Sequence, residues 1–171
     1  MIPGVDYTES FSPVTTEVGV RTVIGISLHF INEDVAKNVP ENDQWVLEVY
    51  DVEAAFLNAN PGTKMYLKIP DEMVELGFVT REEQRQWAIL LANNMYGNVD
   101  AALRFFEKYS GILVEQMGFS QNRADPCIFF KRNDNEQSTM VISTHVDDSL
   151  IGGRKQQVQA FYTEFSKHLK I

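Results

Sequence analysis

The sequence predicts an α+β fold in which helices pack on one face of an antiparallel sheet. Apolar residues follow a helical period from Val20 to Ile31, from Asp100 to Met117 and from Val158 to Leu169. Short β-rich runs lie between these helices, and Asn133-Asp134-Asn135 joins two of them as a typical hairpin turn. Strands joined by short turns pair antiparallel, and helices then cover the sheet in a separate layer.

The first half of the chain supplies two of the expected strands. After a polar loop over Asn38 to Asp43, Trp45 to Val52 is rich in β-branched and aromatic residues. Ala54 to Asn58 fits a short helical turn. A turn at Asn60-Pro61-Gly62 then precedes a further expected strand over Lys64 to Ile69.

An ambiguous stretch follows, and three further expected strands come before the last helix. Thr80 and Glu83 form a capping-box pattern for a short helix. Trp87 to Leu91 fits either a continuation of that helix or a strand, because so short an apolar run has no decisive period. The remaining strands are Cys127 to Arg132, Thr139 to His145 and Ser149 to Gly152.

Length and composition indicate one globular domain with its own core. The chain has 171 residues, of which 44% are hydrophobic and 23% charged. Its apolar stretches are soon interrupted by polar residues, so no membrane span is expected. A single cysteine, Cys127, excludes an intramolecular disulfide.

The charge of the chain does not favour nucleic-acid binding. The formal net charge is −9, and residues 1–100 carry 6 Lys and Arg against 16 Asp and Glu. Residues 101–171 carry 9 against 8. Phosphate backbones are bound by Lys and Arg that displace counterions, so on charge alone this chain is a poor nucleic-acid binder.

Three acidic residues form the sharpest chemical pattern. Asp147-Asp148 lies between two apolar runs, and Asp is depleted in strands, so the pair suits a tight turn. Asp51 ends a strand whose same face is otherwise apolar, where a buried acid needs a partner or a metal. If the two segments are neighbours in the sheet, three carboxylates converge at one edge. Magnesium would relieve their repulsion, and two ions about 4 Å apart can support phosphoryl transfer. The alternative is a turn with no metal.

Five segments spread over nearly the whole chain form a further pattern: Ile2 to Val14, Asp51 to Asn58, Met95-Tyr96-Gly97, Ala124-Asp125-Pro126-Cys127 and His145-Val146-Asp147-Asp148. In this order they resemble the reverse transcriptases of copia-type LTR retrotransposons. The resemblance implies the palm of an RNA-directed DNA polymerase. It covers residues 1–171 as a palm fragment, without the N-terminal part of the fingers, the thumb or the RNase H region.

The resemblance also implies catalytic metal ligands. Asp51 and Asp147 would each bridge two Mg²⁺ or Mn²⁺ ions, Asp148 would assist from the turn, and the backbone carbonyl of Val52 would be a further ligand. Template-primer RNA or DNA, nucleoside triphosphates and the remainder of a retrotransposon polyprotein are the implied partners. The implied location is a cytoplasmic virus-like particle.

Substrate-binding residues follow from the same resemblance. Phe56 occupies the position where related polymerases exclude a ribose 2′-hydroxyl, although an ordinary core aromatic is an equal alternative. Tyr96 and Gly97 belong to the expected substrate-binding element.

The chain departs from the family pattern at two places. Asp100 replaces a Gln expected against the incoming nucleotide, where an unneutralised anion would repel the triphosphate, and His145 replaces an aromatic residue. The basic fingers strands that clasp the triphosphate normally precede the Ile2 segment. Three hypotheses therefore stay open: a polymerase palm active within a fuller protein, a non-catalytic relic that keeps the fold, and an unrelated sandwich that binds a partner through its acidic N-terminal half.

Overall fold

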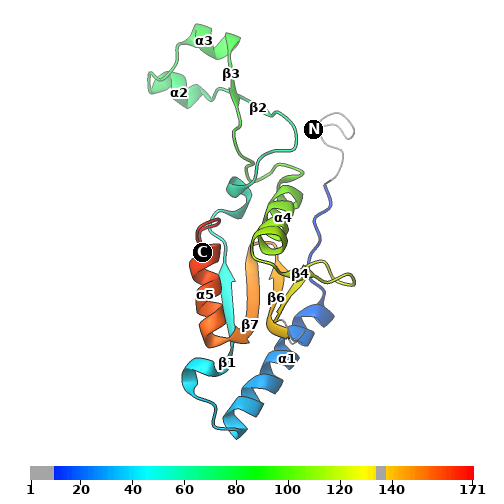
Figure 1. Ribbon diagram of the computed structural model, residues 1–171. Helices are drawn as coiled ribbons and strands as arrows, with labels where there is room; N and C mark the ends of the chain where they lie inside the picture. The colour runs from blue at the N-terminus through cyan, green and yellow to red at the C-terminus, as the bar shows by residue number, and fades with distance from the viewer. Residues whose placement is uncertain (1–9, 134–137) are drawn as a thin grey trace.

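A five-stranded antiparallel sheet organises the body of the molecule. In the computed structural model, which describes residues 10–133 and 138–171, the strand order is β1-β7-β6-β5-β4 (Figure 1). The strands are β1 (Trp45–Asp51), β4 (Ser120–Gln121), β5 (Ile128–Arg132), β6 (Ser138–His145) and β7 (Asp148–Arg154). The predicted α+β class is confirmed. The expected turn at Asn133-Asp134-Asn135 falls largely outside the described residues.

Helices cover both faces of this sheet. Helices α4 (Ala101–Gly111) and α5 (Lys155–Phe165) pack on one face, in a core that includes Ile142 of β6. Helix α1 (Glu17–Ala36) packs on the opposite face, in a smaller cluster that includes Val141. Successive residues of a strand point to opposite faces, so these neighbours in β6 belong to different cores. The expected single helical layer therefore describes α4 and α5, while α1 lies behind the sheet.

The start of α1 is tied to the sheet by the Ala124-Asp125-Pro126-Cys127 segment. Thr16 caps the helix by accepting a hydrogen bond from the Gly19 amide at 2.9 Å. The Asp125 carboxylate accepts hydrogen bonds from the Thr16 amide at 3.0 Å, the Thr16 hydroxyl at 2.9 Å and the Cys127 amide at 3.0 Å. This buried carboxylate is a structural link between the start of α1 and the start of β5.

The end of α1 is held by a second buried carboxylate. Asp34 is 4% exposed, accepts a hydrogen bond from the Trp45 amide at 2.7 Å and forms an ion pair with Arg154 at 2.5 Å. The Arg154 guanidinium, with help from the Trp45 amide, holds the pKa of Asp34 below its usual value despite burial. Asp34 thereby fixes α1 on the first residue of β1 and the last of β7.

An arm projects from the body between β1 and α4 (Figure 1). It contains β2 (Tyr66–Lys68), α2 (Asp71–Glu75), α3 (Arg81–Gln86) and β3 (Ala88–Leu90), and β2 and β3 pair antiparallel as a separate sheet. The capping box of Thr80 and Glu83 is present at the start of α3. The ambiguous stretch from Trp87 to Leu91 is thus a strand.

The helix expected from Asp100 to Met117 is α-helical at its start and π-helical at its end. Helix α4 continues into a π-helical turn, η3 (Ile112–Gln116). The structure buries Phe105 and Tyr109 of α4, and Phe106 is partly buried against the same core. Both of the adjacent aromatic residues therefore contact the core, and Phe105 is the more deeply buried.

Candidate active site

Asp51 and Asp148 lie directly opposite each other where β1 and β7 meet. Asp148 is also paired with His145 across the hairpin formed by β6 and β7. The Val52 amide donates a hydrogen bond to the Asp147 carbonyl at 3.1 Å. The structure therefore brings Asp51, Asp147 and Asp148 to one end of the sheet.

The turn that carries Asp147 has an unfavourable backbone conformation. Only Val146 and Asp147 separate the paired residues His145 and Asp148, so this is a tight hairpin turn. Val146 has a φ of 62°, in the left-handed region that β-branched residues rarely adopt. Such strain persists only where the surrounding structure enforces it, and it is concentrated at functional sites.

Reduced hydration and electrostatic repulsion both make this arrangement costly. The Asp51 and Asp148 side chains are exposed, so the expectation that Asp51 needs a partner because it is buried is wrong. The apolar face of the strand is not buried at this end, where Val49 is 70% exposed. Reduced hydration and the nearby carboxylates of Asp147 and Asp148 raise the pKa of Asp51. A bound cation would relieve the repulsion between these like charges.

The donor atoms suit a hard divalent cation, although their present orientations do not converge. Across residues 10–133 and 138–171, no group of three or more His, Cys, Asp or Glu side chains is arranged to hold a metal ion. Magnesium, however, uses one or two protein carboxylates and completes its octahedron with water and substrate phosphates. The cross-strand pair of Asp51 and Asp148 supplies two such carboxylates. Their chemistry and backbone placement therefore fit magnesium or manganese.

The expected substrate-binding aromatics lie against each other. Phe56, in the short helix η2 (Ala55–Asn58), has its ring centroid 5.1 Å from that of Tyr96. Its ring centroid also lies 6.5 Å from that of Phe105 in α4, and the Phe56 side chain is partly buried against the core. Tyr96 is 60% exposed, and Gly97 has a φ of 95°, which favours glycine. Phe56 is thus a partly buried aromatic that packs against the core and against Tyr96.

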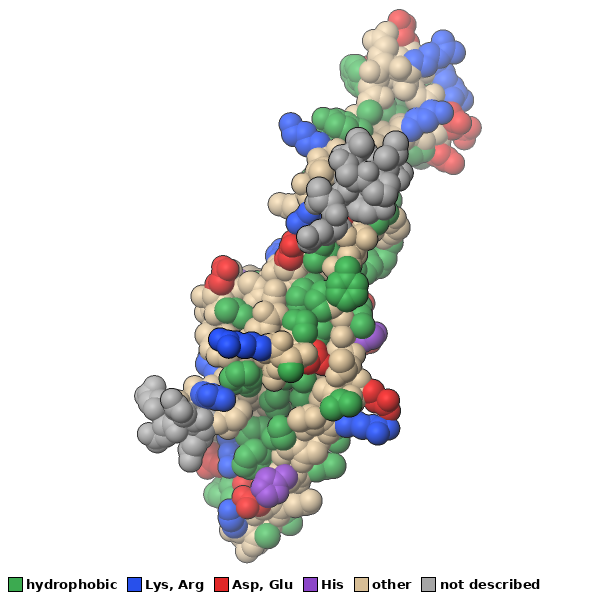
Figure 2. Space-filling model, turned by 90° about the vertical axis from the view of Figure 1, so that its right-hand side faces the viewer, with side chains coloured by type: hydrophobic (Ala, Val, Ile, Leu, Met, Phe, Trp, Pro, Cys, Tyr) green, Lys and Arg blue, Asp and Glu red, His purple; other side chains and the backbone are tan. Residues whose placement is uncertain are grey.

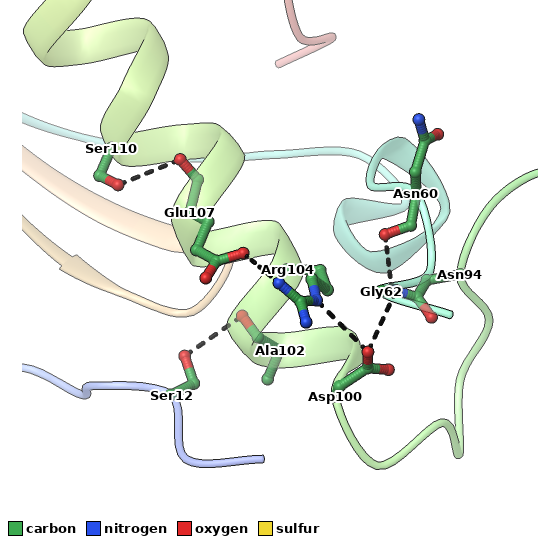
Figure 3. Close-up of polar contacts among 9 residues, drawn as sticks. All are labelled: Ser12, Asn60, Gly62, Asn94, Asp100, Ala102, Arg104, Glu107 and Ser110. Atoms are coloured by element: carbon green, nitrogen blue, oxygen red, sulfur yellow. Dashed lines mark hydrogen bonds and ion pairs between the residues drawn. The ribbon is translucent and has the colours of Figure 1, made fainter. Parts of the chain in front are cut away.

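Asp100 is neutralised within the protein (Figure 3). Asp100 is 2% exposed, and its carboxylate accepts a hydrogen bond from the Gly62 amide at 3.2 Å. Arg104, one helical turn further on, forms an ion pair with it at 3.4 Å and with Glu107 at 2.9 Å. Asp100 therefore joins the start of α4 to the base of the arm, and the sequence-based concern about a free anion at this position does not hold.

Five basic residues of β5, β7, α4 and α5 are engaged by other groups of the protein. Figure 2 shows Lys and Arg side chains scattered over one face of the body, interspersed with acidic ones. Arg154 pairs with Asp34, and Lys155 pairs with Glu41 at 2.6 Å. Arg104 forms an ion pair with an acidic side chain. Lys131 donates to a backbone carbonyl and lies over an aromatic ring, and Arg132 lies over another aromatic ring.

A buried hydroxyl network beneath the carboxylates was not anticipated from the sequence. It joins Tyr50, Tyr109, Ser149 and Thr144, each of which is at most 7% exposed. The available signal was the presence of a hydroxyl residue beside an aspartate in each strand, Tyr50 before Asp51 and Ser149 after Asp148. Tyr109 is remote in sequence, so only the fold reveals the connection.

Comparison with known proteins assigns the family. Residues 1–171 match the reverse transcriptase (RNA-dependent DNA polymerase) family. Over 151 residues, 88% of the chain, it is 25% identical to the retrovirus-related Pol polyprotein from transposon TNT 1-94 of Nicotiana tabacum. It is 26% and 25% identical to those from transposons RE2 and RE1 of Arabidopsis thaliana, over 88% of the chain in both cases.

The chain is much shorter than these relatives. The matched region covers 10% of the Nicotiana polyprotein and 9% of each Arabidopsis polyprotein. No solved structure matches the chain. Within the described part of the chain, none of the helices has the length and apolar character needed to cross a membrane. The chain belongs to the reverse transcriptase family and is homologous to the Pol polyproteins of copia-type retrotransposons.

Proposed function

We propose that this chain is the palm of an RNA-directed DNA polymerase in which Asp51, Asp147 and Asp148 bind divalent cations for nucleotidyl transfer. The observation that carries the proposal is the direct cross-strand pairing of Asp51 with Asp148 in a chain of this family. Exposed carboxylates of like charge, held side by side next to a strained turn, have no evident structural benefit.

The carboxylates and the backbone would share the work of holding the ions. Asp51 presents its carboxylate from the end of β1, beside the Val52 backbone, while Asp147 and Asp148 present theirs from the facing hairpin. Bound Mg²⁺ or Mn²⁺ would neutralise charge on the attacking and leaving oxygens of the phosphoryl transfer. The protein contributes the paired backbone positions of Asp51 and Asp148, from which the side chains can turn toward a shared ion.

The aromatic pair near the start of α4 would contact the incoming nucleotide. Phe56 and Tyr96 present adjoining rings, and Tyr96 is largely exposed. A flat ring beside the sugar can admit a deoxyribose and exclude a 2′-hydroxyl by contact. Template-primer RNA or DNA and the remainder of a polyprotein are the other partners that this function requires.

Metal-linked stability tests the proposal and separates it from a relic that keeps only the fold. A ligand that binds only the folded state raises stability by mass action, so Mg²⁺ should raise the melting temperature of the chain. Asp147→Asn/Asp148→Asn should abolish this gain. Glu72→Gln/Glu75→Gln, which makes the same change in charge on the exposed helix α2, should preserve it. An equal Mg²⁺ response in all three proteins would exclude the site.

A further inference from the structure

Two hydroxyl side chains lie next to the paired carboxylates but on the other side of the strands. Tyr50 precedes Asp51, Ser149 follows Asp148, and Tyr50 and Ser149 are opposite each other in the register of β1 and β7. Side chains alternate along a strand, so both hydroxyls point toward the core beneath α4 and α5. Each carboxylate-bearing strand therefore has a polar group inside the core.

Tyr109 of α4 bridges these two strands. Its hydroxyl oxygen lies 2.6 Å from that of Tyr50 and 2.9 Å from that of Ser149. Both phenols are buried, and a phenol keeps its proton at neutral pH. The Tyr109 ring is packed by aromatic neighbours and is 1% exposed; they are Phe105, Phe129 and Phe165. The bridging oxygen is thus held in place by the core.

The network continues from Ser149 to the strained turn. The Ser149 hydroxyl donates to the Thr144 hydroxyl at 3.0 Å. Thr144 in turn donates toward the carbonyls of Val146 and Asp148 at 3.4 and 3.5 Å. These last contacts are long and weak, so the links between hydroxyls carry most of the restraint.

Proton counting gives the network one direction. A hydroxyl has a single proton to donate, and that of Ser149 goes to Thr144. Tyr109 must therefore donate to Ser149, and Tyr50 must donate to Tyr109. Donors and acceptors then run head to tail from β1 through α4 to β7, an arrangement in which each bond polarises and strengthens the next.

We propose that Tyr109 is a positioning residue of the carboxylate site, because its hydroxyl holds β1 and β7 together and so keeps Asp51 beside Asp148. The inference rests on the proposed function of those carboxylates as metal ligands. Repulsion between the paired carboxylates and strain at Val146 both favour separation of the strand ends. A hydrogen-bonded tie between the residues next to Asp51 and Asp148 opposes that separation.

Three variants of the full 171-residue chain separate positioning from general stability. Tyr109→Phe keeps the ring and removes the hydroxyl, which leaves the buried Tyr50 hydroxyl without its acceptor and lowers stability. Tyr50→Phe/Tyr109→Phe removes both hydroxyls and should regain most of that stability, but it does not restore the tie. Val158→Ala, in the same core and with no hydroxyl involved, is the matched destabilised control.

Hydrogen exchange at single amides reports on the strand ends without any metal. The Val52 amide donates to the Asp147 carbonyl at the carboxylate end, and the Lys155 amide donates to the Gln44 carbonyl at the far end of the same strand pair. In both Tyr109 variants, exchange at Val52 should accelerate about fivefold relative to Lys155, as expected for one lost hydrogen bond. In Val158→Ala, the ratio of the exchange rate at Val52 to that at Lys155 should equal the wild-type ratio.

Manganese affinity, measured by electron paramagnetic resonance, links the tie to the site. It should weaken about fivefold in both Tyr109 variants and stay unchanged in Val158→Ala. If the ratio of exchange at Val52 to exchange at Lys155 is unchanged in the double variant, the proposal is overturned, whether or not metal binds. Faster exchange with unchanged affinity would overturn the claim that the tie serves the metal. Failure of the wild type to bind Mn²⁺ would overturn the proposed function, while the exchange ratio would still decide whether Tyr109 positions the strands.

Discussion

Asp51 and Asp148 occupy directly opposed positions in neighbouring antiparallel strands, which places two carboxylates side by side. Like charges at such positions destabilise a sheet. Reduced hydration and these neighbours raise the pKa of Asp51. The site therefore lowers the stability of the metal-free protein, and this cost makes the account testable without any enzymatic assay.

Asp51→Asn should stabilise the metal-free chain at neutral pH. The folded-state pKa of Asp51 lies above its unfolded value, so the stability that the protonated carboxyl provides is lost as the pH rises through the folded value. The asparagine variant avoids this loss and should melt roughly 1–3 °C higher at pH 7 in a chelator. The gain should shrink near pH 4. A lower melting temperature for Asp51→Asn at pH 7 would refute repulsion as the dominant effect.

Asp34→Asn should have the opposite effect. The ion pair with Arg154 lowers the pKa of Asp34, so its contribution is present above the unfolded value and is lost as the pH falls through the folded value. Removing one partner of this largely buried pair should cost about 2 kcal/mol at pH 7, below the range for fully buried pairs because Arg154 is partly exposed. Urea denaturation should show the wild type and the variant converging toward pH 2. A difference independent of pH would show that packing, not charge, is responsible.

Asp100→Asn should destabilise the junction between the arm and α4. Asp100 is almost fully buried and holds both the Gly62 amide and the Arg104 side chain, so the loss of its charge should cost about 2 kcal/mol. Glu107→Gln removes the other partner of Arg104 at a half-exposed position and should cost less than about 0.5 kcal/mol. Equal losses in urea denaturation would mean that Asp100 has no special role in holding the arm.

The isolated chain should bind nucleic acid weakly and should not extend a primer. Its net charge is −9, and Arg154 and Lys155 are engaged by other protein groups. Fluorescence anisotropy on a labelled primer-template should give an affinity that changes little between 50 and 200 mM salt, because few counterions are released. Primer extension by the wild type that is lost in Asp147→Asn would contradict this prediction and show that the chain is active alone.

The strands that carry the carboxylates were predictable because their signals are local. Trp45 to Val52 is a β-rich run, and Asp147-Asp148 interrupts an apolar pattern that continues on both sides. Side-chain neighbours across the sheet were not predictable. Tyr109 is 59 residues from Tyr50 and 40 residues from Ser149 in the sequence, so only the packing of α4 on the sheet brings the three hydroxyls together.

The ambiguities at the arm and at Asp100 have similar causes. Trp87 to Leu91 is too short to show a period, and its pairing with β2 makes it a strand. The partner of Asp100, Arg104, is one helical turn away, but a sequence does not reveal that the pair is buried against Gly62. Local patterns thus predicted most of the elements and their order, but not the short elements α2 and β4, and long-range packing determined which charges are paired.

Direct titration with Mn²⁺ tests the central claim, that the carboxylates at the ends of β1 and β7 form a divalent-cation site. Electron paramagnetic resonance measures free Mn²⁺ and so gives both affinity and stoichiometry. We expect the wild-type chain to bind Mn²⁺, Asp51→Asn and Asp147→Asn/Asp148→Asn to bind at least about tenfold more weakly, and Glu72→Gln/Glu75→Gln to match the wild type. Equal Mn²⁺ binding by all four proteins, or none by the wild type, would contradict the account.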